Sequence, residues 1–533
     1  MTVYVPEEFS TAESDVLRRY FTNLDGPVFA LVNLPEVVKG ALFARYSRSP
    51  KSLRRLFLDE FVGELDISGD VGVDASVGMQ RAEELYEKVF LEYGDDSVAQ
   101  LGGVHLACEQ ASNVLTKILE WGRLMSYLEQ STRYIAYDAR LGGRYRYHRD
   151  PAVLNSRFGT RYVGDMDRMF DAYSLLLERV TDHVRATVPR GANDSDFVYR
   201  QATRAKALDA VRGVLPAASL SNVGIYGSGQ AFEALLLRMR SHLLPEAREY
   251  ADLMLFELRK VIPSFLRRVD LPERGGEWSD YLAATRDETH ALVQQFLGRA
   301  PVEVTPTVTL VDFDPDAEDK LLAAICYPHT AMGEAQLLER VRRLPTDERV
   351  ALLSAYVGDR RNRRHRPGRA FERVDYRFDV LSDYGGFRDL QRHRMLTIEW
   401  QALTPYHGYV RPDLVDDAGL APVFDEAMHR SATLFDSLAP EFPAQAAYAV
   451  SMAYRIRYAM QFNAREAMHL LELRSSPQGH PSYRRVAIEM HRQIAEVAGH
   501  RAIAAAMSHL STEEPALERL ESERRAEVRR LRP

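Results

Sequence analysis

The sequence contains little cysteine and no long apolar run. Its 533 residues include two cysteines, Cys108 and Cys326, which lie far apart and lack C-x-x-C spacing. This pattern indicates neither a disulfide framework nor a cysteine zinc site, and it fits a reducing compartment. No segment approaches the roughly 18 apolar residues that a membrane helix needs. Residues 1–20 carry four acidic side chains and no apolar core, so we expect no signal peptide and a cytoplasmic protein.

An excess of positive charge is also missing. The formal net charge is -7, which argues against an overall attraction to nucleic acid or anionic membranes. One basic loop keeps nucleic-acid binding open as a lesser alternative. Its arginines are Arg360, Arg361, Arg363, Arg364, Arg366 and Arg369. Because no aromatic residues are interleaved with them, we favour a solvated loop or one that faces a cofactor.

The composition and length predict a globular protein with more than one domain. Hydrophobic residues make up 46% and charged residues 27% of the chain, and 533 residues exceed what one core usually supports. Residues 271–305 are rich in glycine, proline and polar residues and are the best candidate for a linker. We therefore predict two domains, residues 1–275 (the first half) and residues 300–533 (the second half).

The periodicity predicts an α+β fold that is predominantly helical, with small sheets packed against long helices. Apolar residues recur at intervals of three and four in 98–133 and 446–474, as in helices. Residues 511–533 predict a solvated terminal helix. Short strands are predicted in three places: 144–148, 302–311 and 374–380.

Two clusters in the second half could bind an anion. Arg392, His393 and Arg394 are consecutive, and arginine forks match phosphate oxygens; a solvated surface is the alternative. Asn463 and Arg474 share one stripe of a predicted helix. A partly buried arginine needs a partner there, either a ligand or an internal glutamate such as Glu466 or Glu472.

The first half has a cluster of small polar, acidic and basic residues that could hold a nucleotide phosphate. It comprises Ser126, Glu129, Gln130, Ser131, Arg133 and Tyr134. A surface ion pair between Glu129 and Arg133 is the simpler alternative, and such a pair contributes only a few tenths of a kcal/mol. No metal site is indicated.

These motifs resemble those of the flavin-dependent thymidylate synthases, whose motif is R-H-R-x-x-S-x-N-E-x-S-x-R-Y. The second half has its beginning, Arg392 to Arg394, and then departs, for example at Trp400. The first half has its end, through Glu129, Ser131 and Arg133, but carries W-G in place of the leading R-H and Leu128 in place of the asparagine. Both halves therefore look like diverged copies of one unit.

The same division recurs downstream. R-G-V-L-P at 212–216 resembles the family's R-x-V-L-P element, and the second half has Ala447 in place of Arg212. N-A-R-E-A-M-H-L-L-E-L-R at 463–474 resembles the family's N-A-R…L-R helix, of which the first half keeps only Arg238. The offset between the halves is 271 residues at the first motif (392 − 121) and 236 at the second (474 − 238). His365 resembles a histidine of the family's flavin loop, where the first half has 95–97.

In this family the active sites lie between subunits of a homotetramer. Two halves that each keep one part of a site imply a composite site and a homodimer that mimics the tetramer. The implied reaction methylates dUMP, or a related pyrimidine nucleotide, with methylenetetrahydrofolate, using FAD reduced by NADPH. The implied catalytic residue is Arg474. The implied flavin residues are Arg392, His393, Arg394, Asn463, Arg465 and His365. The implied nucleotide residues are Glu129, Gln130, Ser131, Arg133 and Arg212. A non-catalytic paralogue that binds flavin or nucleotide is the alternative.

Overall fold

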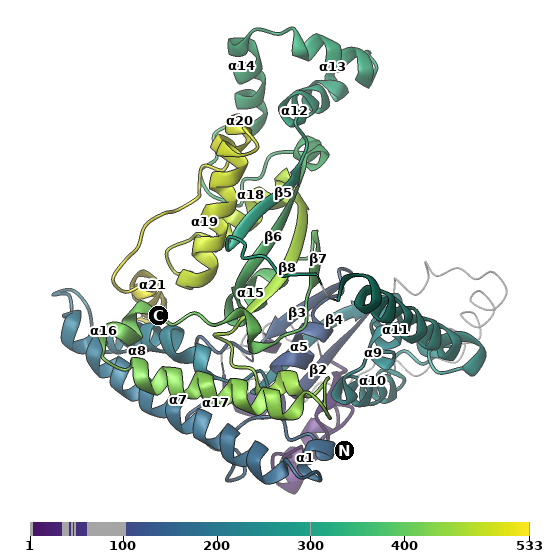
Figure 1. Ribbon diagram of the computed structural model, residues 1–533, viewed down its shortest axis with the longest axis vertical. Coiled ribbons are helices and arrows are strands. Elements are labelled where there is room, and N and C mark those ends of the chain that lie inside the picture. Colours follow the sequence, from purple (N-terminus) through teal and green to yellow (C-terminus); the bar gives the residue numbers. More distant parts are fainter. Residues whose placement is uncertain are drawn as a thin grey trace. The chain divides into compact units, whose positions relative to one another are not determined.

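A computed structural model describes residues 4–34, 42, 43, 46, 49–60, 103–298 and 300–531 (Figure 1). The chain forms two compact units, each built from separate segments. Unit 1 comprises Met1–Asp171, Pro216–Val302 and Arg430–Ala449. Unit 2 comprises Ala172–Leu215, Glu303–His429 and Val450–Pro533. Each unit thus takes a segment from the other half of the sequence. The boundaries 1–275 and 300–533 were predicted for the two sequence copies, and for those they stay a prediction.

Each unit contains one four-stranded antiparallel sheet. In unit 1 the strand order is β1-β2-β4-β3 and in unit 2 it is β5-β6-β8-β7. The strands of unit 1 are β1 (Val28–Leu31), β2 (Gly103–Ser112), β3 (Met125–Glu129) and β4 (Leu220–Ser228). Those of unit 2 are β5 (Val308–Phe313), β6 (Asp375–Asp383), β7 (Leu396–Trp400) and β8 (Arg455–Asn463). The same order in both sheets fits two copies of one unit.

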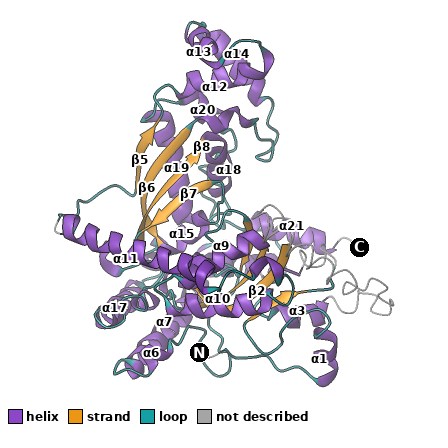
Figure 2. Cartoon of the chain, turned by 90° about the vertical axis from the view of Figure 1, so that its right-hand side faces the viewer, coloured by secondary structure: helices purple, strands orange, loops and turns teal. Residues whose placement is uncertain are grey.

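Helices supply most of the remaining structure, so the α+β, predominantly helical class is confirmed (Figure 2). Unit 1 contains α1 (Thr11–Leu17), α3 (Leu53–Glu60), α5 (Asn113–Leu119), α6 (Pro151–Leu154), α9 (Gly229–Arg240), α10 (Pro245–Leu258) and α11 (Glu277–Leu297). Unit 2 contains α8 (Asp196–Val211), α12 (Ala317–Cys326), α13 (Glu334–Arg342), α14 (Thr346–Val357), α15 (Tyr384–Gln391), α16 (Asp413–Asp417), α18 (Ala464–Arg474), α19 (Pro481–Glu496), α20 (Arg501–Ala506) and α21 (Leu520–Leu531). Helices α7 (Gly159–Thr187) and α17 (Ala421–Leu438) each contain a unit boundary.

Four strands end on a residue that caps the following helix. The side chains of Ser112, Asp383, Ser228 and Asn463 accept backbone N–H groups of α5, α15, α9 and α18. Such caps satisfy helix N–H groups that have no partner within the helix. They fix the turn from strand to helix at equivalent places in both sheets.

The strand register tests the predicted offsets between the halves. Met125 opens β3 opposite Gly227, and Leu396 opens β7 opposite Phe462. The first offset of 271 (396 − 125) is confirmed, whereas the second is 235 (462 − 227). The pairing of Arg474 with Arg238 was therefore wrong by one residue.

Several predicted elements differ from the structure. Within 98–133 and 446–474, strands β2, β3 and β8 interrupt the predicted helices. The predicted strand at 144–148 forms only isolated bridges. Strand β6 confirms most of the strand predicted at 374–380, whereas β5 covers only residues 308–311 of the one predicted at 302–311. The predicted linker contains the 21-residue helix α11, and α21 confirms a terminal helix. Among the described residues, no helix is both long and apolar enough to cross a membrane.

Candidate functional site

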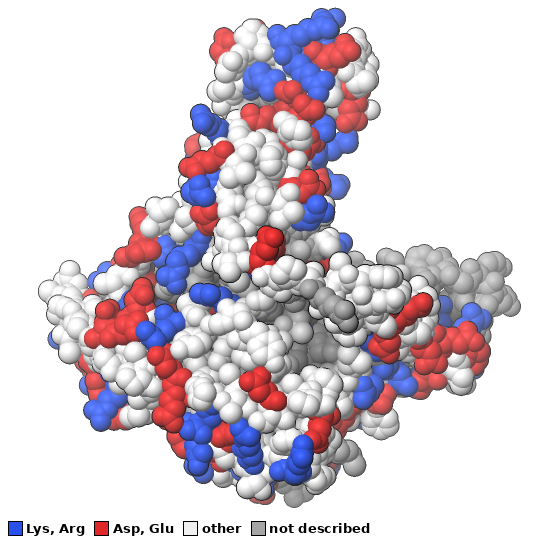
Figure 3. All heavy atoms as spheres, viewed as in Figure 1, with Lys and Arg blue, Asp and Glu red and all other residues white. Residues whose placement is uncertain are grey.

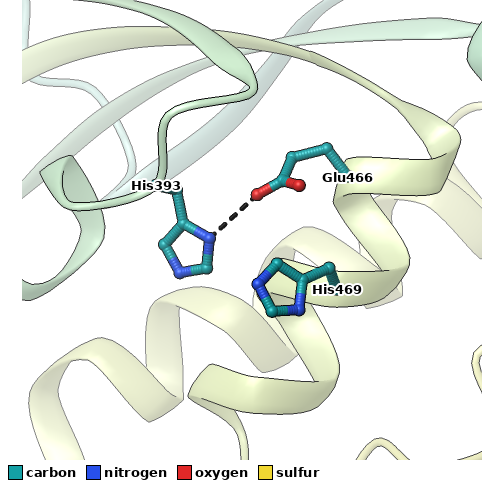
Figure 4. Close-up of side chains that lie close together, drawn as sticks. All are labelled: His393, Glu466 and His469. Atoms are coloured by element: carbon teal, nitrogen blue, oxygen red, sulfur yellow. Dashed lines mark hydrogen bonds and ion pairs between the residues drawn. The ribbon is translucent and has the colours of Figure 1, made fainter. Parts of the chain in front are cut away.

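The predicted second-half residues gather where α15 ends and α18 packs beside the sheet of unit 2. His393 follows the last turn of α15, while Glu466 lies in the first turn of α18 and His469 one turn later (Figure 4). His393 Nδ1 lies 2.9 Å from Glu466 Oε1, and Arg474 Nε donates to His393 Nε2 at 3.0 Å. Since a guanidinium can only donate, His393 Nε2 is the acceptor and Nδ1 carries the proton toward Glu466.

Burial and neighbouring arginines set the charges of this cluster. Burial raises the pKa of Glu466 to about 7, against the opposing charge of Arg366. Burial, and then the positive charge of Arg474, holds the pKa of His393 well below its ordinary value. Burial, and then Arg366, lowers the pKa of His469 to about 4. Both imidazoles are therefore neutral at pH 7, and Glu466 titrates near pH 7.

The cluster has the residue types of a metal site but not the hydrogen bonding of one. The ligand atoms of His393, Glu466 and His469 lie within 4.8 Å of one another. A metal-binding imidazole usually donates its second N–H to an acceptor. Here Arg474 faces His393 Nε2, and Arg366 Nη2 lies 2.9 Å from His469 Nδ1. The arginines thus occupy both imidazole lone pairs, and this donor set does not fit a cation.

A second cluster surrounds the buried carboxylate of Asp389. Arg212 Nη1 lies 3.3 Å from it, Arg392 Nη2 forms a close ion pair with it, and Arg474 Nη1 lies 3.8 Å away. Arg212 comes from the first half and Asp389 from the second. One compact unit therefore combines residues of both halves.

Arg212 still has hydrogen-bonding capacity. It is 3% exposed, and its Nε and Nη2 have no hydrogen-bond partner among the residues that the structure describes. The side chain borders a cavity of about 400 Å³, which α8, α16 and the start of α19 also line. A Cβ built at Gly385 would lie 3.4 Å from both nitrogens, so the glycine packs close to the guanidinium. Buried donors without partners are costly, so an acceptor at this place would be stabilising.

The other predicted flavin residues lie in the same unit but differ in their contacts. Asn463 caps α18, its Oδ1 accepting the backbone N–H of Glu466 at 2.9 Å. Arg465 donates to the carbonyl of Pro367 at 3.0 Å. Arg394 and His365 are exposed. His469, which the sequence analysis did not select as a ligand, has its ring centroid 5.3 Å from that of His393.

The predicted nucleotide residues of the first half, apart from Arg212, lie in unit 1. Glu129 is buried and contacts Lys117 Nζ at 3.1 Å, so the alternative of an exposed Glu129–Arg133 pair is wrong. Gln130 donates to the carbonyl of Ser49 at 2.8 Å, and Ser131 Oγ accepts the backbone N–H of Arg133 at 3.2 Å. These residues and the second-half cluster belong to different units, so a site that combines them stays a prediction.

The basic loop is partly structural. Arg360 is buried and donates to both carboxylate oxygens of Glu472 at 2.6 Å. This pair also shows that Glu472 is not the partner of Arg474. On the face drawn in Figure 3, acidic and basic side chains are interspersed over the part of the chain that is described. These contacts do not favour the nucleic-acid alternative.

Asp389, Glu466 and His469 are site residues that the sequence analysis did not assign. Asp389 precedes Arg392 by three residues, which is the spacing of helix neighbours. Glu466 and His469 share that spacing after the cap at Asn463. Their contacts with His393 and Arg212 join segments distant in the sequence, which local spacing cannot reveal.

Comparison with known proteins identifies related sequences. A family model described as thymidylate synthase complementing protein matches residues 51–264 and 309–499, one match in each half. A UPF0159 protein from Chlamydia pneumoniae is 40% identical over 92% of this chain and 93% of its own length. Another from Chlamydia muridarum is 39% identical over 97% and 98%, and one from Thermoplasma acidophilum is 31% identical over 92% and 99%.

One solved structure is also similar in part. It is a UMP/dUMP methylase from Streptomyces cacaoi bound with 5-Br dUMP, 21% identical, with a TM-score of 0.30 over 37% of this chain and 94% of that one. A TM-score this low carries no structural argument.

Proposed function

Because the chain belongs to the thymidylate synthase complementing protein family, in two tandem copies, we propose that it is an FAD-dependent thymidylate synthase-like methyltransferase. Its substrate would be dUMP or a related pyrimidine nucleotide, and methylenetetrahydrofolate would supply the carbon. NADPH would reduce the flavin. The site would combine the second-half cluster of unit 2 with Glu129, Gln130, Ser131 and Arg133 of unit 1.

The observation that carries this proposal is the charge balance around Asp389. Three guanidinium groups, of Arg212, Arg392 and Arg474, contact one carboxylate. The buried Asp383 carboxylate also acts on Arg212, so three guanidinium groups stand here with two carboxylates. A phosphate monoester is anionic at pH 7 and offers three acceptor oxygens, which suit guanidinium donors. The open donors of Arg212 beside the cavity give such a group a partner.

The residues expected to hold FAD have a donor set that suits its pyrophosphate and ring carbonyls. Arg392, Arg394 and Arg465 are cationic donors, and His393 is held neutral by burial. Asn463 uses its Oδ1 as the helix cap, which leaves its amide N–H groups available. His365 would contribute from the loop before β6. When bound, reduced FAD supplies the hydride for the reaction.

Arg474 would orient the pyrimidine and polarise its carbonyl oxygens. Its Nε is held by His393 and its guanidinium lies over the Tyr483 ring, 5.4 Å from the ring centroid. The planar fork is therefore fixed before a ligand arrives, which is the condition for electrostatic stabilisation of developing charge. Glu129 and Arg133 would position the nucleotide from unit 1.

A non-catalytic paralogue is the second candidate, and one contact in unit 1 favours it. Trp121 replaces the first arginine of the R-H-R motif, and the guanidinium of Arg238 lies over its ring, 4.6 Å from the centroid. The first copy of this part of the site is thus filled by a cation–π contact. If the remaining copy has also lost turnover, the protein would bind flavin or nucleotide without methylating it.

The visible absorbance spectrum of the purified protein tests the proposal. The protein is reconstituted with FAD, reduced anaerobically, and mixed with dUMP and methylenetetrahydrofolate. Reoxidation of the flavin band with formation of dTMP is the expected result. Bound flavin without dTMP would favour the paralogue or another pyrimidine substrate. Absence of flavin binding would overturn the assignment of Arg392, His393 and Arg394.

A further inference from the structure

We propose that Glu466 is a positioning residue that aligns Arg474 by fixing the tautomer of His393. Its consequence for ligand binding rests on the function proposed above, whereas the tautomer itself does not. The three side chains form a continuous chain of hydrogen bonds, from the Glu466 carboxylate through both nitrogens of His393 to Arg474 Nε. Figure 4 shows the first of these contacts and the neighbouring His469.

The position of the proton on His393 follows from its two partners, Arg474 at Nε2 and Glu466 at Nδ1. In water a neutral imidazole can carry its proton on either nitrogen, and its partners decide which. Arg474 presents an N–H to Nε2, so a proton on Nε2 would place two donors against each other at 3.0 Å. The carboxylate of Glu466, at 2.9 Å, accepts the proton on Nδ1. Arg474 and Glu466 thus favour the same tautomer, and Glu466 supplies the acceptor that the buried Nδ1–H needs.

The neighbouring charged groups are committed elsewhere, which leaves Glu466 to His393. Arg465 interacts with Glu372 at 3.4 Å, and Arg366 contacts His469. The Glu466 and His393 side chains are 7% and 4% exposed, so water competes little for these bonds. Hydrogen bonds in such an environment are stronger and more directional than at the surface.

The hydrogen-bond chain from Glu466 through His393 to Arg474, called the relay below, orients the Arg474 guanidinium. Arg474 is anchored at Nε, and its Nη1 lies 3.8 Å from the Asp389 carboxylate, which is longer than a hydrogen bond. Its guanidinium also hydrogen-bonds the Tyr483 side chain, so only the Nη hydrogens that this bond leaves over could serve a carbonyl or phosphate oxygen. A shift of His393 to the other tautomer would push Nε away and rotate this edge out of position.

Protonation of Glu466 adds a pH dependence to the relay. The groups that face it are Arg366, Arg465, Arg474, His393 and His469. Above pH 7 the ionised carboxylate accepts from Nδ1–H and holds the productive tautomer. Below pH 7 a protonated Glu466 can donate to Nδ1, so the relay weakens as the pH falls.

The test is nitrogen NMR of the protein labelled with ¹⁵N-histidine, without flavin or nucleotide. We expect His393 at pH 8 to be protonated at Nδ1 and unprotonated at Nε2, with the signal identified by its loss in His393→Gln. Glu466→Leu should raise the fraction of His393 that is protonated at Nε2, because Nδ1–H then loses its acceptor. The matched control is Glu472→Gln, which alters a buried, arginine-bound carboxylate of the same helix and should leave the tautomer unchanged. A wild-type His393 protonated at Nε2 would overturn the proposal, even if Glu466→Leu does not fold.

Titration with dUMP then tests the link to Arg474. We expect Glu466→Leu to weaken dUMP binding about tenfold, and the effects of Glu466→Leu and Arg474→Lys to be non-additive in a double-mutant cycle. Full additivity would contradict the positioning role. If the tautomer is as expected but no form of the protein binds dUMP, the relay stands and the proposed function fails.

Discussion

Arg474 is the residue on which the proposed chemistry depends most directly. It is held by His393, lies over Tyr483 and approaches Asp389, so its fork is fixed in three directions. Arg474→Lys keeps a positive charge but removes the planar fork. We expect dUMP to bind about 10- to 100-fold more weakly, the loss of a charged hydrogen bond of about 1.5 to 3 kcal/mol. Arg501→Lys, at an exposed position on α20, is the control, and equal affinities of the two variants in calorimetric titration would refute the role.

Glu466 should also impose a pH dependence on stability. Its pKa rises from 4.5 to about 7 on folding because burial disfavours the charged form. The folded state then binds the proton more tightly than the unfolded state, so stability falls as pH rises from about 4.5 to about 7 and stays lower above that. The shift corresponds to about 3 kcal/mol at most. Glu466→Gln should therefore lose less stability than the wild type between pH 5 and pH 8 in thermal or denaturant unfolding. A parallel loss in both proteins would show that Glu466 is not the titrating group.

At the scale of elements, Asn463 ends β8 and caps α18, and its side chain has one group for the cap and another that a ligand could use. Asn463 offers its Oδ1 to the backbone of α18, and its amide N–H groups are the ones that would reach a flavin. Asn463→Asp keeps the acceptor and adds a negative charge that a helix N-terminus favours. We expect it to retain stability but bind FAD more weakly, whereas Asn463→Ala should also lose about 1 kcal/mol of stability. Unfolding curves and fluorescence titration with FAD distinguish the two. Unchanged FAD affinity in both variants would remove Asn463 from the flavin site.

Local sequence patterns predict some of these elements and site residues but not others. The motif beginning at Arg392 and the helix ending at Arg474 were found because their residues are contiguous or follow helical spacing. Strand β2 was missed because it is buried along most of its length and shows no alternation. Strand β8 does alternate, with Ile456, Tyr458, Met460 and Phe462 on its buried face, but a window shared with α18 concealed this period. Glu466 gains its role from a contact with His393, and Asp389 gains part of its role from a contact with Arg212, and both contacts join segments distant in the sequence.

At the scale of the whole molecule, the duplication explains why each half looks incomplete. The two sheets have the same strand order, yet unit 2 takes Arg212 from the first half and Asp389 from the second. A chain built in this way need not keep every motif residue in both copies. Loss of the leading R-H from the first half and of S-x-R-Y from the second is then compatible with one intact site. In unit 1, Trp121 stands at the position of the motif's first arginine, and the Arg238 guanidinium lies over its ring.

This organisation also yields a prediction about assembly. In the family that the motifs resemble, four single-copy subunits form the active sites, and two double-copy chains would supply the same number of units. We therefore expect a homodimer of about 121 kDa (2 × 60.6 kDa), measured by sedimentation equilibrium or light scattering. Because apolar burial drives such interfaces and salt does not screen it, the mass should persist at high salt. A mass near 60.6 kDa at micromolar concentration would instead mean that a single chain must complete its site alone.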